Sequence, residues 1–388
     1  MNKSTLYYIW LTQGIGYCTT KVKYIYGLYP DIELLYKGGE QELRLCGIFT
    51  EKEIAKLTKT KLSVAENILR RCEELNFKVY DITMDEYPQR LREIPDAPAV
   101  IYVSGELPDF ESVDSVSIVG TRRATVYGIR TALSLGANLS KIGFVVVSGG
   151  ALGIDCAAHR GVLQEKGKAV CVLGCGIDFD YLLENKELRN AIALTGALVS
   201  EYPPGSAAAS HNFPQRNRII SALSNGVIVV EAPKKSGSMI TVDFALKQGK
   251  DVFAVMGNVD SPYSAGSNQL IKEGAVPITC WQDVCEYYRG VIDSEPEAIT
   301  EEVVKTIPSK NKDITAHSEN KPVPVHKNTD SLSDDERKVY LSISSEPVHI
   351  DVIAEKCGLP PYVVIRAVSS LELKDLIQNT SGRLYAIK

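Results

Sequence analysis

The chain of 388 residues contains no long hydrophobic run and no excess of positive charge. No stretch is apolar and long enough to span a bilayer, and residues 1–10 lack the apolar core and cleavage site of a signal peptide. We therefore expect a cytoplasmic protein. The chain has 43 Lys and Arg residues and 48 Asp and Glu residues, so its formal net charge is −5. Any nucleic-acid site therefore has to be a local patch of positive charge.

The chain also lacks the residue spacings of metal and nucleotide sites. Its nine cysteines include no Cys-x-x-Cys pair, and its five histidines form no ligand pair. We interpret the cysteines as small buried hydrophobes in a reducing compartment and expect no metal and no cofactor. The glycine-rich segment 149–153 matches neither the dinucleotide fingerprint nor the P-loop pattern.

The chain does contain one sequence pattern that occurs four times. An apolar run ends in glycine or a small polar residue, and a helix-like pattern follows. Continuous apolar strands joined by helical crossovers predict an α/β fold, here an extended Rossmann-like parallel sheet covered on both faces. The predicted strands are 115–120, 144–148, 169–173, 197–200, 226–231, 251–256 and 276–279.

Composition divides the chain into four parts. Residues 1–70 are predicted to form a small helical domain, and residues 71–293 hold the sheet. Residues 294–330 are predicted to be a flexible linker, because prolines lie among polar residues without periodicity. Residues 331–388 show three helices and a closing hairpin, the pattern of a winged helix. Its third helix carries few basic residues, so we interpret this domain as a protein-binding module.

A glycine turn near the N-terminus has two interpretations. Gly14-Ile15-Gly16 follows a helix-like stretch and resembles the turn of a helix-hairpin-helix or SAM-like domain, where backbone amides hold a DNA phosphate. The alternative is a glycine turn inside a small helical bundle.

Turns that follow parallel strands lie at the carboxyl edge of the sheet, where free N–H groups and helix N-termini attract anions. Arginine offers a planar fork for phosphate oxygens, and glycine lets a ligand approach the backbone. Each turn has a structural alternative: a surface ion pair, a tight strand–helix turn or a helix cap. Together they predict an anion-binding edge made of Arg122, Arg123, Gly149, Gly150, Ser236, Gly237 and Ser238.

A further basic group precedes the fourth run. Arg216 and Arg218 lie two residues apart at the start of a predicted helix, so they cannot share one helical face. Asn217 adds amide donors, and Phe213 offers a surface for stacking or packing. One of the two arginines can instead form a buried ion pair with a glutamate.

The sequence gives little support for catalysis. His159 lies in a predicted helix interior with no serine or cysteine nucleophile assigned to it. Glu201 and Glu231 end neighbouring runs and can in principle act as acid and base, but binding to arginine is the interpretation that we favour. We therefore expect no catalytic residues and no enzymatic activity.

Several motifs follow one another in a fixed order through the predicted sheet domain. They include Ser117-Ile-Val-Gly-Thr-Arg122, Phe213-Pro-Gln-Arg-Asn-Arg218 and the segment from Glu231 to Ser238. This order resembles the DNA-processing protein A (DprA/Smf) family. The flanks also look like the helical N-terminal domain and the winged-helix C-terminal domain of that family.

The resemblance implies a homodimeric mediator of recombination. Such a protein would bind single-stranded DNA, protect incoming DNA and help load RecA recombinase in natural transformation, without catalysis. Carried over by motif, DNA contacts would come from Arg122, Lys186, the Gly149 loop and the segments 216–218 and 236–238. Two positions depart from the family pattern: Met256 stands where proline is usual, and the proline that normally follows the tyrosine at position 181 is missing.

The alternative function is nucleotide binding or hydrolysis of a nucleoside phosphate by a related Rossmann-like enzyme. Enzymes of the phosphoribohydrolase type share a Pro-Gly-Gly-x-Gly-Thr-x-x-Glu signature at the late strand–helix turn. Here that turn runs from Lys235 to Asp243 without the glutamate. Its absence favours DNA binding.

Overall fold

The computed structural model describes residues 3–290, 332–343, 348–374, 376–379 and 384–387. These residues belong to two compact units, divided between residues 309 and 310. The predicted linker and most of the hairpin turn predicted at 379–382 lie outside the described residues. Within the described ranges, no helix is both long and apolar enough to cross a membrane.

A nine-stranded sheet forms the centre of the first unit, in the order β1-β2-β6-β5-β4-β3-β7-β8-β9. The strands from β6 to β9 in this order pair in parallel, whereas β2 is antiparallel to both β1 and β6. All the strands predicted between residues 115 and 279 are present, so the predicted fold class is confirmed. The bounds are β1 Lys78–Asp81, β2 Val100–Gly105, β3 Ser115–Val119, β4 Val145–Ser148, β5 Ala169–Leu173, β6 Ala197–Ser200, β7 Gly226–Val229, β8 Asp251–Val255 and β9 Val276–Ile278.

Helices cover both faces of this sheet. Successive strand residues point to opposite faces, so Val146 packs in one apolar core and its neighbours Val145 and Val147 pack in the other. The first core also receives side chains from α8, α9, α10 and α14, and the second from α11, α12 and α13. The bounds are α8 Val126–Lys141, α9 Ile154–Gln164, α10 Lys186–Thr195, α11 Asn212–Ala222, α12 Gly237–Lys247, α13 Ala265–Lys272 and α14 Trp281–Arg289.

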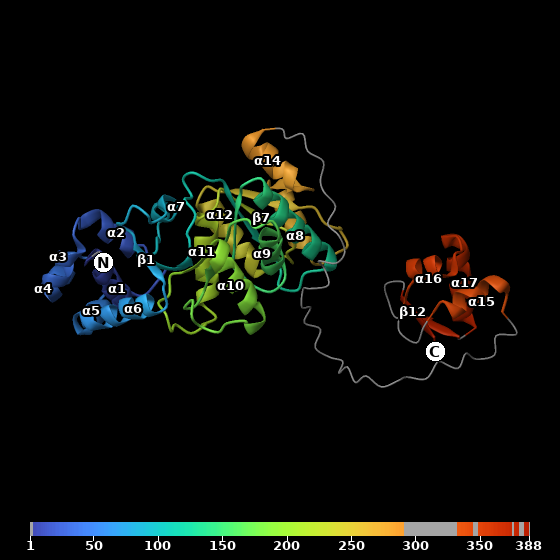
Figure 1. Cartoon of the computed structure of the whole chain (residues 1–388), viewed down its shortest axis with the longest axis horizontal. Coiled ribbons are helices and arrows are strands. Elements are labelled where there is room, and N and C mark those ends of the chain that lie inside the picture. Colours follow the sequence, from blue (N-terminus) through green and yellow to red (C-terminus); the bar gives the residue numbers. More distant parts are fainter. Residues whose placement is uncertain (1–2, 291–331, 344–347, 375, 380–383, 388) are drawn as a thin grey trace. The chain divides into compact units, whose positions relative to one another are not determined.

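The N-terminal helices gather at one end of the first unit, beside β1 (Figure 1). Tyr8 and Trp10 are buried in the same apolar core as Tyr102 of β2. The boundary predicted at residue 70 falls inside α6, and the core continues across it. The bounds are α1 Lys3–Ile15, α2 Lys21–Leu28, α3 Ile32–Lys37, α4 Gly39–Leu45, α5 Glu51–Lys59, α6 Leu62–Glu74 and, between β1 and β2, α7 Gln89–Glu93.

The glycine turn that ends α1 uses its amides within the protein. The Gly16 amide donates to the Thr12 carbonyl oxygen at 2.9 Å, and the Cys18 amide donates to Glu201 Oε1 at 3.4 Å. Gly16 has φ +82, which explains glycine at this position. The contacts favour a structural turn over a phosphate-binding hairpin.

The order of the strands creates a switch point at β3. From β3 the chain adds β4, β5 and β6 on one side, and it then returns to add β7, β8 and β9 on the other. In open α/β sheets, the crevice at the carboxyl ends of the strands beside such a reversal is where ligands bind.

The second unit has its own apolar core, which includes Tyr340, Ile353 and Val364. Ser333 and Glu336 form a capping box at the start of α15, as the predicted cap at Ser333 requires. A short strand, β10, was not predicted; it pairs with β12 of the closing hairpin. The bounds are α15 Asp334–Leu341, β10 Val348–His349, α16 Ile350–Cys357, α17 Pro361–Leu373, β11 Ile377–Asn379 and β12 Leu384–Ile387.

Candidate nucleic-acid interface

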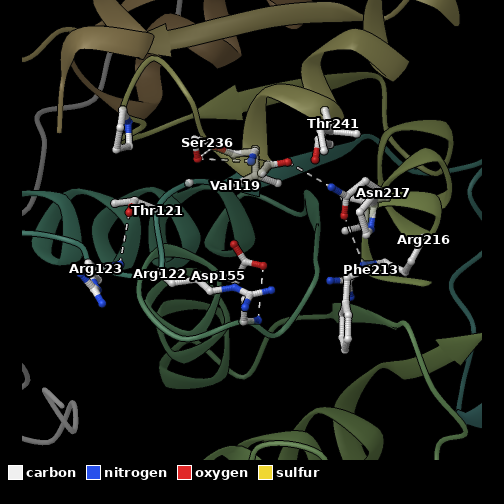
Figure 2. Close-up of a pocket in the computed structure, with 18 of the residues that line it drawn as sticks. Val119, Thr121, Arg122, Arg123, Asp155, Phe213, Arg216, Asn217, Ser236 and Thr241 are labelled. Atoms are coloured by element: carbon white, nitrogen blue, oxygen red, sulfur yellow. Dashed lines mark hydrogen bonds between the residues drawn. The ribbon is translucent and has the colours of Figure 1, made fainter. Parts of the chain in front are cut away.

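A pocket of about 580 Å³ lies at the switch point of the sheet, and we call it the cationic pocket. Its walls come from four segments that lie far apart in the sequence: the β3–α8 loop, the β4–α9 loop, α11 and the β7–α12 loop. Figure 2 shows the β3–α8 loop and α11 on opposite sides of Asp155. Its lining includes Gly120, Thr121, Arg122, Arg123, Ala151, Asp155, Tyr181, Phe213, Arg216, Asn217, Lys235, Ser236, Gly237 and Ser238.

Arg122 and Arg123 are exposed at the mouth of the pocket. Neither forms an ion pair with any residue that the structure describes. The Arg122 guanidinium lies 6.0 Å from the ring centroid of Phe213, at the limit of a cation–π contact. The alternative, a surface ion pair, is therefore absent from the described residues. Both positive charges are available to a ligand.

The loop that carries these arginines is anchored by a buried glutamate. Glu231 accepts hydrogen bonds from the Thr125 amide at 2.9 Å and from the Thr125 hydroxyl at 2.6 Å. The same hydroxyl accepts from the Gly128 amide and caps α8. The expectation that Glu231 binds an arginine is therefore wrong, because Thr125 holds its carboxylate.

Arg216 forms part of the pocket floor. Its side chain is buried, and Nη1 donates to the carbonyl oxygens of Gly149, at 2.9 Å, and of Val172. Burial lowers the pKa of this guanidinium, which the neighbouring Asp155 carboxylate partly offsets. Its direct partners are therefore mainly neutral carbonyls at the base of the pocket.

Asp155 lies beside Arg216 at the start of α9. Its carboxylate accepts from the amides of Gly149, at 3.2 Å, and of Ala151, at 3.3 Å. Burial raises the pKa of Asp155 to about 6, although Arg216 and these amides oppose the shift. The carboxylate thus changes charge close to neutral pH.

Gly149 and Gly150 of the β4–α9 loop shape the pocket but do not line it. A Cβ at Gly149 would lie 2.7 Å from Arg216 Nη2 and 2.9 Å from Asp155 Oδ2. Gly150 has φ +63, which is unfavourable for other residues. A Cβ at position 149 would therefore displace the Arg216 guanidinium or the Asp155 carboxylate.

Arg218 has a different position from the other predicted contacts. It is fully buried, with Nη2 2.8 Å from Glu201 Oε1 and Nε 3.2 Å from Asp96 Oδ2. The predicted DNA contact through Arg218 does not fit this geometry, because both carboxylates already hold its guanidinium inside the protein. The structural alternative, an ion pair with Glu201, is what the structure contains.

Lys186 also lies apart from the pocket. It is exposed at the start of α10, where Nζ is 2.9 Å from Asp180, and it is not a lining residue. The serines of the β7–α12 loop do line the pocket, although Ser236 also caps α12 by accepting from the Ser238 amide. Asn217 Nδ2 donates to the Gly237 carbonyl oxygen at 3.3 Å and joins α11 to this loop.

Two aromatic rings line the pocket, whereas His159 is buried away from it. The rings of Tyr181 and Phe213, both in the pocket wall, have centroids 4.8 Å apart. His159 is buried, with Nε2 3.3 Å from the Val170 carbonyl oxygen, and burial lowers its pKa to about 4. It therefore packs inside α9 and does not reach the pocket.

The predicted site residues omit two lining residues that matter for charge. Lys235 brings a third exposed cation without an ion-pair partner among the described residues, and Asp155 brings the one carboxylate of the lining. A basic residue directly before the small-residue turn at Ser236 was the available signal for Lys235. No local signal indicates that Asp155 approaches Arg216, because 60 residues of chain separate them.

Comparison with known families decides the relationship. Residues 78–289 match the family model for DNA recombination-mediator protein A, and residues 323–383 match the model for the DprA winged helix domain. The chain belongs to this family. Residues 78–289 include all those that line the cationic pocket of this chain, and the winged-helix match confirms the prediction for the C-terminal part.

The chain matches most of the length of its curated relatives in the family. The DNA processing protein DprA of Bacillus subtilis is 39% identical over 59% of this chain and 78% of that protein. Protein Smf of Escherichia coli is 33% identical over 82% of this chain and 79% of that protein.

Two solved structures of family members are similar. The X-ray structure of DNA processing protein A from Streptococcus pneumoniae has a TM-score of 0.65 and 33% identity, and covers 73% of this chain and 98% of that chain. A structure from Helicobacter pylori, described as giving insights into the single-stranded DNA binding mode of DNA processing protein A, has a TM-score of 0.50 and 31% identity. It covers 54% of this chain and 94% of that chain.

Proposed function

We propose that this protein binds single-stranded DNA in the cationic pocket and acts as a recombination mediator. The observation that carries the proposal is the set of cations Arg122, Arg123 and Lys235, which face one pocket without ion-pair partners in the described structure. Phosphates of a DNA strand would supply those partners. The single-stranded DNA named for the Helicobacter pylori relative supports the same ligand.

A strand fits this pocket better than a single nucleotide. The cations come from two separate loops, so they can meet successive phosphates along a backbone. The paired rings of Tyr181 and Phe213 offer a surface against which a base can stack, a contact worth about 1–3 kcal/mol. Neither the dinucleotide fingerprint nor the P-loop is present to hold one nucleotide tightly.

The experiment that tests this function compares single-stranded and duplex DNA of increasing length, with wild-type protein and Arg122→Ala. We expect tighter binding of single strands, weaker binding by the variant, and a salt slope smaller by about 0.7 for the lost phosphate contact. Arg70→Ala, an exposed arginine on α6, is the matched control. Equal affinity of correctly folded Arg122→Ala and wild type would contradict the proposal.

We further propose that the protein acts as a homodimer that helps load RecA recombinase onto incoming DNA in natural transformation. Family membership alone supports this extension, and it assigns no contact surface. Light scattering of the full chain would test the dimer. Strand exchange by RecA, with and without this protein, would test loading, and an unchanged rate would contradict it.

We propose that the protein is not a hydrolase. The Glu231 carboxylate anchors the β3–α8 loop through two hydrogen bonds from Thr125, which supports a structural role for this residue. Incubation with nucleoside monophosphates should therefore release no base. Release that disappears in Glu231→Gln would revive the enzymatic alternative.

A further inference from the structure

A second pocket, of about 370 Å³, opens beside the cationic pocket at the carboxyl edge of the sheet. Its lining residues are Thr125 and Tyr127 from the start of α8, Glu231 after β7, and Met256, Gly257, Asn258, Ser261 and Ser264 after β8. One loop links the two pockets, because Thr121, Arg122 and Arg123 line the first and Thr125 lines the second. A strand held at the arginines therefore passes next to it.

The chemistry of the second pocket excludes a phosphate. No lysine or arginine is among its described lining residues, and its one charged member is the acid Glu231. That carboxylate is buried and bound by Thr125, so it repels an anion but adds no counter-charge. The ligand that fits is neutral. The volume lies within the range of about 300–1,000 Å³ that is typical of small-molecule sites.

Two large apolar side chains are exposed on the wall of this pocket. Tyr127 is 50% exposed and Met256 is 45% exposed. The Tyr127 hydroxyl donates to the Met256 carbonyl oxygen at 2.8 Å, which fixes the ring against the loop after β8. A held aromatic ring beside a thioether offers two polarizable surfaces for a flat ligand.

Polar groups on the same loop can read the edge of such a ligand. The loop is anchored because Asn268 Oδ1 accepts from the Gly257 amide at 3.2 Å, while Asn268 Nδ2 donates to the Gly257 carbonyl oxygen at 3.0 Å. Asn258 Oδ1 accepts from the Asp260 amide, which leaves its amide NH₂ without a partner among the described residues. Amide and hydroxyl groups beside stacking surfaces match a nucleobase.

We propose that the second pocket receives a nucleobase of the DNA strand whose phosphates bind at Arg122 and Arg123. The proposal rests on the proposed function and adds a base subsite to it. Tyr127 and Met256 provide the stacking surfaces, and Asn258 and Ser261 provide the hydrogen-bonding groups. The cationic pocket would bind the phosphates, and the second pocket would bind the uncharged ring of a base.

The test crosses protein variants with DNA that has or lacks bases. Tyr127→Ala and Met256→Ala are compared with wild type on an oligonucleotide with normal bases and on an abasic oligonucleotide of equal length. We expect each variant to bind the normal strand about fivefold or more weakly, and the abasic strand as well as wild type does. Tyr127→Phe keeps the ring and should retain most of the affinity. Tyr24→Ala, an equally exposed tyrosine on α2, is the matched control.

The outcomes separate the two proposals. An equal loss by Tyr127→Ala and Met256→Ala on normal and abasic strands, or no loss, would overturn the base subsite while leaving strand binding intact. Failure of wild type to bind any single strand would instead overturn the proposed function. Fluorescence of 2-aminopurine in the strand gives a second readout: stacking should quench it in wild type, and Tyr127→Ala should restore it.

Discussion

The guanidinium groups of Arg216 and Arg218 leave α11 on opposite sides, although one residue separates them in the sequence. Arg216 reaches the carbonyl oxygens at the base of the cationic pocket, and Arg218 reaches the carboxylates of Asp96 and Glu201 inside the protein. Residues i and i+2 of a helix are about 200° apart, so α11 places one arginine at the floor of the cationic pocket and the other in the protein interior.

Arg218→Ala should mainly destabilise the fold. Removing one partner of a buried ion pair leaves the other charge uncompensated, which costs about 3–5 kcal/mol. Chemical denaturation measures this loss. Arg122→Ala, whose side chain is exposed, should change the free energy of unfolding by less than about 1 kcal/mol. Similar stability of the two variants would contradict the structural role of Arg218.

Gly149→Ala should weaken DNA binding without adding or removing a charge. The new Cβ would displace the guanidinium of Arg216 from the Gly149 carbonyl oxygen, at a cost to stability of about 1–3 kcal/mol. Gly27→Ala on α2 is the control, because the added Cβ would meet nothing within 4 Å apart from its adjoining residues and its own helix backbone, and alanine favours a helix. Binding titrations and thermal unfolding of both variants would decide; unaltered affinity of Gly149→Ala would be inconsistent with the geometry.

DNA affinity should rise as the pH falls from 7 to 5. The pKa of Asp155 in the folded protein is raised to about 6, so its carboxylate is charged at pH 7 and mostly neutral at pH 5. Protonation removes a negative charge from the pocket that binds phosphates. Asp155→Asn should bind more tightly than wild type at pH 7 and lose most of this pH dependence. His211→Gln, which removes the exposed imidazole next to α11, is the control and should keep the pH dependence of wild type.

The same shift has a defined sign for stability. Between about pH 4 and pH 6, folded Asp155 holds a proton that the unfolded chain has lost, so this residue makes the fold less stable as the pH rises through that window. The free energy of unfolding of wild type minus that of Asp155→Asn should therefore fall as the pH rises from about 4 to about 6. A difference that rises would refute the raised pKa.

Deleting residues 331–388 should leave most of the DNA affinity in place. The second unit has its own apolar core, and the cationic pocket is lined wholly by the first unit. We expect a change smaller than about tenfold, or about 1.4 kcal/mol, in titrations of the shortened and full-length chains. A larger loss would show that the winged helix contributes to DNA binding.

The sequence predicted what depends on local pattern. Continuous apolar runs such as 227–230 give buried parallel strands, and Ser333 followed by Glu336 gives a capping box. It could not predict which partner each charged side chain meets. Glu201 and Glu231 end neighbouring runs in the same way, yet one holds Arg218 and the other holds the Thr125 loop. Arg218 lies 17 residues after Glu201, whereas Thr125 lies 106 residues before Glu231, so each pairing depends on how separate segments meet in space.

The apolar core shared by α1 and β2 bears on how this protein can be cut. The family model begins at residue 78, but Tyr8 and Trp10 are buried together with Tyr102, which lies within the matched range. A fragment that starts at residue 78 would turn this interior wall into open surface and invite aggregation. The start of the match marks where likeness to relatives begins, whereas the apolar core begins at α1, so we expect a fragment that includes α1 to be more stable than one that starts at residue 78.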